Sequence, residues 1–150
     1  MTHLTAREYR PEDFSETEFS PHEQCIVAEQ PIGEWAKFHG KQGPARTVVD
    51  PDGAVVFCAG IHHFWHGTGE VWALFSPLAR RYLETPRFAK QLLELYVARF
   101  GYERLQAVVN PDWPEAVRFI ELLGFEKETL MKKYGPNGVD MVLYAWVKGD

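Results

Sequence analysis

The segment of residues 110–125, with the sequence NPDWPEAVRFIELLGF, most constrains what this chain can fold into. Four of its apolar residues recur at the i, i+3, i+4, i+7 spacing of one helical face: Ala116, Phe119, Ile120 and Leu123. Gly124 follows the last of them, where the end of a helix favours a left-handed residue. Because Phe125 then begins another extended run, the segment predicts a strand end, a turn, one amphipathic helix and re-entry into a strand.

The composition is typical of one globular domain. The chain has 150 residues, of which 45% are hydrophobic and 25% charged, and a chain of this length buries most of its apolar surface without disulfides or metals. We therefore expect a single domain over residues 1–150. The net charge of −5 and the lack of a basic block argue against nucleic-acid binding, which needs clustered Lys and Arg.

The sequence indicates a cytoplasmic protein with no membrane partner. Residues 1–14 contain no apolar stretch of the kind that a secretory signal requires, and no apolar run approaches the ~18 residues of a membrane helix. Cys58 lies in the apolar run VVFCAGI and is expected to be a small buried hydrophobe. A disulfide with Cys25 stays open as an alternative, although such a pair is unusual in a cytosolic chain.

Periodicity and turn residues predict a mixed α/β fold. The Pro-Asp-Gly turn at residues 51–53 indicates a hairpin, since proline sets φ and glycine accepts a positive φ. The expected strands are Thr5–Tyr9, Ala45–Val49, Ala54–His62, Glu70–Ser76, Leu105–Val109, Glu126–Tyr134 and Val139–Val147. Helices are expected from Pro11, in two or three short pieces over Phe14–His39, and over Pro86–Phe100 and Asp112–Leu123. This order predicts a mixed, mostly antiparallel central sheet flanked by helices.

The pattern N-x5-A-x3-I-x3-GF within residues 110–125 resembles the fourth motif of the GNAT superfamily of acyl-CoA-dependent N-acetyltransferases. The order of the expected elements is similar to the GNAT topology over roughly the whole chain. The resemblance implies a GNAT-like fold and transfer of an acetyl group from acetyl-CoA to a primary amine. It also implies that the helix of this motif helps to build the acyl-CoA cleft.

The resemblance assigns a cofactor-binding role to a loop and to a strand. Pro77 and Arg80 match the P-x-x-R of the family's pyrophosphate loop, but the chain has no glycine between Gly69 and Gly101. Non-glycine residues stand where the family's loop glycines are expected: Arg81, Leu83 and Thr85. Three arginines either bind the phosphates through their side-chain charge or only face water: Arg80, Arg81 and Arg87.

Other cofactor contacts implied by the resemblance involve the backbone and one asparagine. Ala73, Leu74 and Phe75 would hold pantetheine through backbone groups, and the alternative is that they form a plain core strand. Asn110 matches the motif asparagine, and the alternative is an Asx turn or N-cap before the following helix.

The resemblance gives one candidate catalytic residue. Attack by an amine needs a base, and Glu70 at the start of its strand is the best placed carboxylate, the alternative being a surface charge at the strand edge. Ile120 stands where many GNAT enzymes have the tyrosine that protonates the leaving thiolate. Four tyrosines lie outside that motif position: Tyr82, Tyr96, Tyr134 and Tyr144.

The run His62-His63-Phe64-Trp65-His66 does not predict a metal site. Adjacent histidines in a strand point to opposite faces, so at most two converge, although His62 and His66 can share a face. A role near the substrate is conceivable for these residues because they lie close to Glu70 in the sequence. A nucleophilic pair of Cys58 and His62 has no supporting motif.

A narrower resemblance concerns the C-terminal half. The runs VWALFSPLARRY, FIELLGF and KKYGPNGVDMVLYAWV are similar to phage-encoded GNAT-like proteins, a group that includes internal virion proteins of tailed phages. This resemblance implies an alternative function, a catalytically inactive accessory or virion protein that contacts phage or host proteins. It also implies a location in the bacterial cytoplasm or in the virion.

Overall fold

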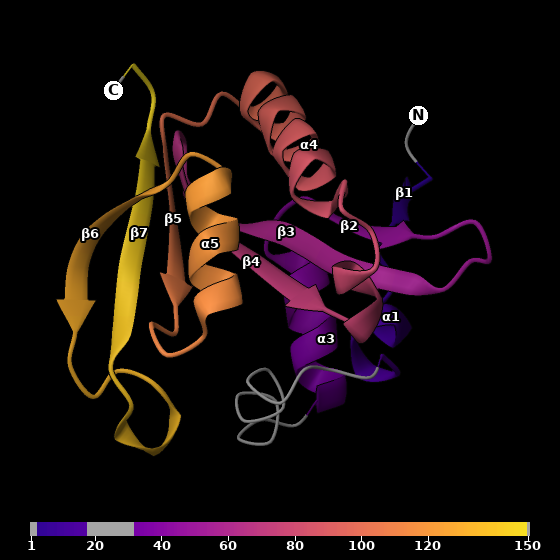
Figure 1. Ribbon diagram of the computed structural model, residues 1–150. Coiled ribbons are helices and arrows are strands. Elements are labelled where there is room, and N and C mark those ends of the chain that lie inside the picture. The colour runs from indigo at the N-terminus through magenta and orange to yellow at the C-terminus, as the bar shows by residue number, and fades with distance from the viewer. Residues whose placement is uncertain (1–2, 18–31, 150) are drawn as a thin grey trace. The chain divides into compact units, whose positions relative to one another are not determined.

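The computed structural model describes residues 3–17 and 32–149 (Figure 1). In these residues the hydrogen-bonded strand order is β1-β2-β3-β4-β5-β7-β6. The expected fold class, a mixed and mostly antiparallel sheet with flanking helices, is confirmed. Of the short helical pieces expected over Phe14–His39, any part that falls in residues 18–31 lies outside the described residues, as does Cys25.

The chain divides into two compact units. The first unit combines Met1–His62 with Trp72–Phe88, and the second combines His63–Val71 with Ala89–Asp150. The single domain expected over residues 1–150 stays a prediction.

The first unit is built around a run of antiparallel strands. Its complete elements are β1 (Thr5–Glu8), α1 (Pro11–Ser15), α3 (Ile32–Lys41), β2 (Ala45–Val49) and a short 3-10 helix at Pro77–Arg80. β3 (Val55–Trp65) begins in this unit, and β2 pairs antiparallel with both β1 and β3. The predicted hairpin between β2 and β3 is confirmed: Asp50 Oδ1 accepts backbone hydrogen bonds from Asp52 and Ala54, and Gly53 has φ +83°.

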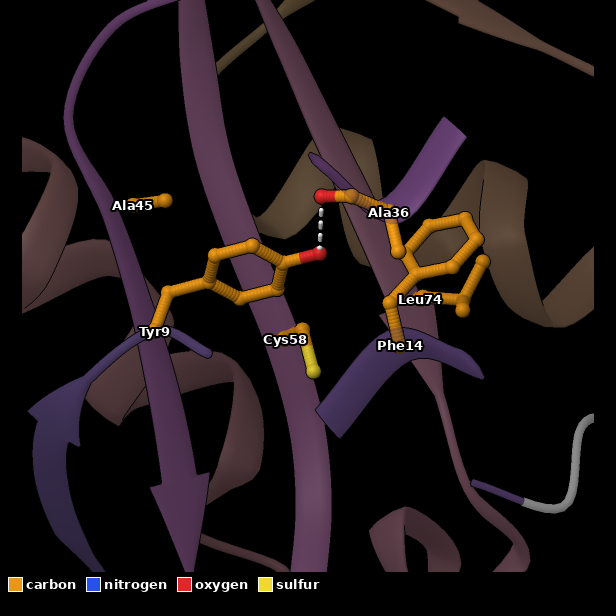
Figure 2. Close-up of a cluster of buried hydrophobic side chains, with 6 residues drawn as sticks. All are labelled: Tyr9, Phe14, Ala36, Ala45, Cys58 and Leu74. Atoms are coloured by element: carbon orange, nitrogen blue, oxygen red, sulfur yellow. Dashed lines mark hydrogen bonds between the residues drawn. The ribbon is translucent and has the colours of Figure 1, made fainter. Parts of the chain in front are cut away.

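A cluster of buried hydrophobic side chains holds the helices of this unit against its strands (Figure 2). Its members are Tyr9, Phe14, Ala36, Ala45, Cys58 and Leu74. The Tyr9 hydroxyl donates a 2.8 Å hydrogen bond to the Ala36 carbonyl oxygen, so the one polar atom of that side chain is satisfied on helix α3. Cys58 is fully buried, which confirms its expected role as a small core residue.

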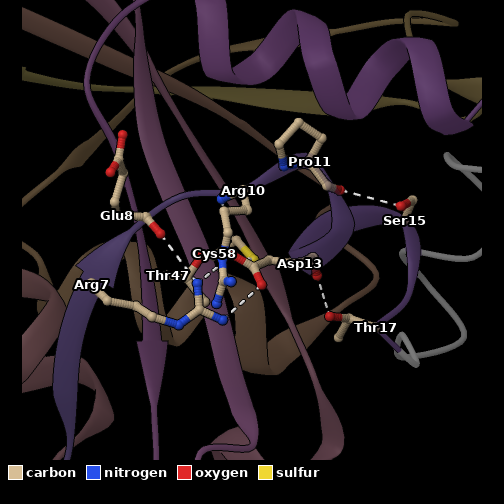
Figure 3. Close-up of polar contacts among 9 residues, drawn as sticks. All are labelled: Arg7, Glu8, Arg10, Pro11, Asp13, Ser15, Thr17, Thr47 and Cys58. Carbon is tan, nitrogen blue, oxygen red and sulfur yellow. Dashed lines mark hydrogen bonds and ion pairs between the residues drawn. The ribbon is translucent and has the colours of Figure 1, made fainter.

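A buried carboxylate ties helix α1 to the first two strands (Figure 3). Asp13 accepts two hydrogen bonds from the Arg7 guanidinium at 2.8 and 2.7 Å, one from the Thr47 hydroxyl at 2.7 Å, and one from the Arg10 backbone at 2.9 Å. Burial raises the pKa of Asp13, but these hydrogen bonds and the charge of Arg7 outweigh burial and lower that pKa. The carboxylate is therefore ionised and fully used as an acceptor at neutral pH.

The second unit contains the parallel step of the sheet. β4 (Thr68–Phe75) pairs parallel with β5 (Arg104–Val109), which pairs antiparallel with β7 (Met141–Val147). β7 in turn pairs antiparallel with β6 (Glu126–Met131), as expected for a closing hairpin. Helix α5 (Pro114–Leu122) packs on β5 (Figure 1). Helix α4 (Thr85–Phe100) starts in the first unit and continues into the second, within one residue of its predicted bounds.

Several predicted boundaries shift for identifiable reasons. Helix α5 begins at Pro114 instead of Asp112, because Asn110 accepts backbone hydrogen bonds from both Asp112 and Trp113 and so closes a turn first. β6 ends at Met131 instead of Tyr134, because Lys133 adopts φ +57° and its backbone N–H bonds to an Asp140 carboxylate oxygen. The predicted left-handed cap after α5 is confirmed at Gly124, with φ +94°.

Candidate functional site

The loop after β4 is fixed by hydroxyl side chains. The Ser76 hydroxyl contacts the Val55 and Val56 carbonyl oxygens at 2.7 and 3.0 Å, and it accepts a hydrogen bond from the Leu78 backbone. Ser76 therefore caps the 3-10 helix at Pro77–Arg80 and joins it to β3. The local sequence explains this turn, because serine is favoured as the N-cap of a helical turn and proline as its first residue.

The start of helix α4 is held by a residue that stands where the resemblance expects a glycine. Thr85 is buried, and its hydroxyl lies 2.7 Å from the Tyr82 carbonyl oxygen and 3.2 Å from that of Ala79. The Tyr82 hydroxyl donates to Asp50 in the β2–β3 turn at 3.1 Å. The loop is thus shaped by side-chain hydrogen bonds in place of glycine backbone freedom.

Three exposed arginines surround this loop. Arg80 ends the 3-10 helix, Arg81 follows it, and Arg87 lies in the first turn of α4. The backbone N–H groups at the start of this 16-residue helix carry the positive end of its dipole. Side-chain charge and helix end together make this part of the first unit suited to an anion such as a phosphate.

The three strand residues that the resemblance assigns to pantetheine follow the end of the parallel ladder. That ladder pairs Thr68 with Arg104, Gly69 with Leu105 and Glu70 with Gln106. Further along β4, the Leu74 side chain belongs to the hydrophobic cluster and the Phe75 ring lies 5.6 Å from the Phe57 ring. Ala73 is half-buried. The side chains of Leu74 and Phe75 serve the core, so any ligand contact from them would involve the backbone.

The two remaining candidates lie in the second unit. Glu70 is half-buried, and one of its carboxylate oxygens accepts a 3.1 Å hydrogen bond from the Gln106 side chain on β5. Asn110 closes an Asx turn, with its side-chain oxygen 2.9 Å from the Asp112 backbone nitrogen. Of the two alternatives for Asn110 drawn from the sequence, the turn is therefore present.

The position of the family's tyrosine is part of the core. Ile120 is only 5% exposed on helix α5, together with the buried Leu123 and Phe125. The second unit therefore offers no proton donor at that position. Tyr144, one of the tyrosines outside the motif, is also buried, and burial raises the pKa of its hydroxyl.

An imidazole pair in the first unit was not predicted from the sequence. His39 Nδ1 on α3 lies 2.7 Å from His62 Nε2 on β3, whereas His66 is exposed in the following turn. The His39 ring is 4.4 Å from the Trp72 ring on β4, with 27° between the planes. The expectation that His62 and His66 share a face overlooked His39, because the two partners are 23 residues apart and no local pattern links them.

The described residues contain no group of three or more His, Cys, Asp or Glu side chains arranged to hold a metal ion. Among the helices of residues 3–17 and 32–149, none combines the length and apolarity that a membrane span requires.

Solved structures with the same arrangement of elements include several acetyltransferases. An acetyltransferase of the GNAT family from Bacillus anthracis superimposes with a TM-score of 0.76 at 17% identity, covering 99% of this chain and 97% of that one. The chain has the GNAT fold. A chimera of the spermidine N-acetyltransferase SpeG from Vibrio cholerae and hSSAT gives a TM-score of 0.76 at 15% identity, covering 97% and 96% of the two chains. A putative phosphinothricin N-acetyltransferase gives a TM-score of 0.72 at 16% identity, covering 98% of this chain and 99% of that one.

These likenesses confirm the GNAT-like fold that the motif at residues 110–125 implied. No protein-family model and no curated protein matches the sequence. The GNAT fold is therefore visible in the arrangement of the elements at identities where the sequences themselves have diverged.

Proposed function

We propose that this protein is an N-acetyltransferase that moves an acetyl group from acetyl-CoA to a primary amine. The observation that carries the proposal is the likeness over nearly the whole chain to structures of GNAT acetyltransferases. The proposal is further supported by the arginine-rich loop that precedes helix α4, because a loop at the start of a helix suits the phosphates of a CoA thioester.

In this proposal the cofactor is held in the absence of a glycine cradle. Arg80 and Arg81 contribute charge-assisted hydrogen bonds to the phosphates, and the positive end of the α4 dipole adds electrostatic attraction. The backbone of Ala73, Leu74 and Phe75 holds the pantetheine arm by strand-like pairing, and Asn110 completes the cofactor contacts.

The proposed chemistry is direct attack of the amine on the thioester in a ternary complex. Glu70 is the candidate base, acting through water on the proton that the amine loses. The carbon–sulfur bond breaks with its electron pair going to sulfur. A thiolate is a tolerable leaving group, so the reaction does not depend on a tyrosine at the position of Ile120.

The proposed acceptor is a small molecule or peptide that carries a primary amine. The similar structures include proteins named for spermidine and for phosphinothricin, both of which carry a primary amine. The net charge of −5 favours the encounter with a cationic amine over the encounter with an anionic one. We place the protein in the cytoplasm, where acetyl-CoA is present.

A second candidate is a GNAT-like protein without catalytic activity, which contacts phage or host proteins as an accessory or virion component. The observation that favours it is the set of departures from the motifs: Arg81, Leu83 and Thr85 in the loop, and the buried Ile120 in α5. In this candidate the loop keeps its shape through Thr85 but binds no cofactor.

The arginines provide the test that separates the two candidates. An acetyl-CoA-binding protein is stabilised by RT ln(1 + [L]/Kd), so its melting temperature rises with ligand. We expect the Arg80→Ala and Arg81→Ala double variant to lose most of this rise in melting temperature. The control is Lys127→Ala on β6, which removes one positive charge away from the loop and should keep the full rise. Equal shifts in the wild type and the double variant would remove both arginines from the site.

A further inference from the structure

The imidazole pair of the first unit forms a chemically complete hydrogen-bonded unit. The His39 and His62 rings are within 16° of parallel and their centres are 4.8 Å apart. The distance between His39 Nδ1 and His62 Nε2 is 2.7 Å, so one hydrogen bond joins the two nearly parallel rings. Either nitrogen can be the donor of this bond, according to the tautomers of the two rings.

Three elements converge on the pair and set its orientation. The centre of the Phe14 ring on α1 lies 4.9 Å from the centre of the His39 ring, and the Trp72 ring on β4 stacks against the same His39 ring. Phe38, which is 45% exposed, approaches the His62 ring edge to face at 5.3 Å. His39 is thus enclosed, whereas His62 keeps part of its surface accessible beside an exposed aromatic ring.

A polar atom next to the pair lacks a partner. The Trp72 indole N–H is buried and has no hydrogen-bond partner among the described residues. An unsatisfied buried donor is destabilising, so a site that retains one commonly offers it to a ligand or an ordered water. Trp72 directly precedes Ala73, the first of the residues that the proposed function assigns to pantetheine.

Both imidazoles are neutral at neutral pH. Burial and the neighbouring His62 lower the pKa of His39 to about 4, and burial lowers the pKa of His62. A neutral imidazole has a free lone pair and can accept a proton, which a protonated one cannot.

We propose that His62 takes the proton that the acceptor amine loses during acetyl transfer, and that His39 is the positioning residue that holds the His62 ring. The inference rests on the proposed function and deepens it by giving the role of base to His62 in the first unit in place of Glu70. It requires His62 to carry its proton on Nε2, donated to His39 Nδ1, which leaves the Nδ1 lone pair of His62 for the substrate.

The proposed reaction forms one amide bond and breaks one thioester bond. The amine nitrogen forms a bond to the carbonyl carbon of acetyl-CoA, and the C–S electron pair leaves with the CoA sulfur. The N–H proton moves to His62 Nδ1, while the Nε2 proton of the same ring stays in the hydrogen bond to His39 Nδ1. The proton is then released to solvent or to the CoA thiolate, and the pair returns to its neutral state.

The test compares two candidate bases in the same assay. Release of the CoA thiol is followed from pH 5 to 9, with acetyl-CoA as donor and with spermidine and phosphinothricin as amine probes. The variants are His62→Ala, His62→Gln, Glu70→Gln and, as a matched control, His66→Gln in the exposed turn after β3. Acetyl-CoA affinity is measured in parallel for each protein.

We expect His62→Ala and His62→Gln to lower kcat roughly 100-fold, the usual scale for general-base catalysis, with acetyl-CoA affinity unchanged. Added imidazole should restore part of the activity of His62→Ala, a rescue that a merely structural role would not give. The inference is overturned if both His62 variants keep the wild-type kcat and pH profile while Glu70→Gln loses activity, a result that leaves the proposed function standing. If the wild type acetylates neither amine, the inference and the proposed function fail together.

Discussion

At the scale of single residues, Asp13 is the side chain on which the first unit most depends. It is 7% exposed and accepts hydrogen bonds from Arg7, Thr47 and the Arg10 backbone. Asparagine cannot accept all four of these hydrogen bonds and leaves buried donors unsatisfied, so Asp13→Asn should lower the free energy of unfolding by about 2 kcal/mol. Urea denaturation measures the change, with the exposed Glu12→Gln on the same helix as the control. Equal stability of the two variants would contradict the role of Asp13.

His39 should make stability fall as the pH is lowered. Its pKa is about 4 in the folded protein against 6.5 in an unfolded chain, so between these values the unfolded state binds more protons. One extra proton bound by the unfolded state lowers the free energy of unfolding by roughly 1.4 kcal/mol for each unit by which the pH falls. The loss should begin as the pH falls through 6.5 and continue toward pH 4, where carboxylates such as Asp13 add to it.

The prediction is checked by urea denaturation at pH 7 and pH 5.5. The decrease between these two values should be smaller in His39→Gln than in the wild type, and unchanged in the exposed His66→Gln. A His39→Gln variant with the full wild-type decrease would show that other groups carry the pH dependence.

At the scale of elements, Gly60 lets β3 pass close to its neighbours. A Cβ atom there would lie 2.5 Å from the Pro44 carbonyl oxygen and 2.8 Å from the Trp72 indole nitrogen. The first contact is with backbone and cannot be relieved by a rotamer change, so Gly60→Ala should cost about 2 kcal/mol.

Gly40→Ala on α3 is the matched control for Gly60→Ala. Its Cβ would meet only two ring carbons of Tyr9, at 3.1 and 3.2 Å, and alanine is favoured over glycine in a helix by about 1 kcal/mol. Thermal unfolding of both variants compares them directly. A Gly60→Ala variant as stable as Gly40→Ala would show that β3 can shift away from residue 44.

Local patterns were enough to predict the elements but not all of their ends. The helical spacing at residues 116–123 and the glycine that follows gave α5 and its cap, because both are properties of consecutive residues. The end of β6 depends on Asp140, seven residues beyond Lys133. Such a contact has no signature in the sequence of the strand itself.

At the scale of the whole molecule, the GNAT fold was predictable because element order survives when individual residues change. The site was less predictable. The sequence showed only that the loop after β4 lacks the family's glycines. In the structure, Ser76 and Thr85 fix the backbone of that loop by side-chain hydrogen bonds. The pairing of His39 with His62 joins a helix to a strand, so it depends on tertiary packing that no spacing along the chain encodes.

The most direct test of the account is calorimetric titration of the purified protein with acetyl-CoA, with free CoA as a control. We predict micromolar binding, since the arginines and the start of helix α4 supply the charge that holds the phosphates. Such binding would make acceptor screening with primary amines the next step. No heat of binding at millimolar acetyl-CoA would contradict the central claim and would mean that the GNAT fold is kept here without its cofactor.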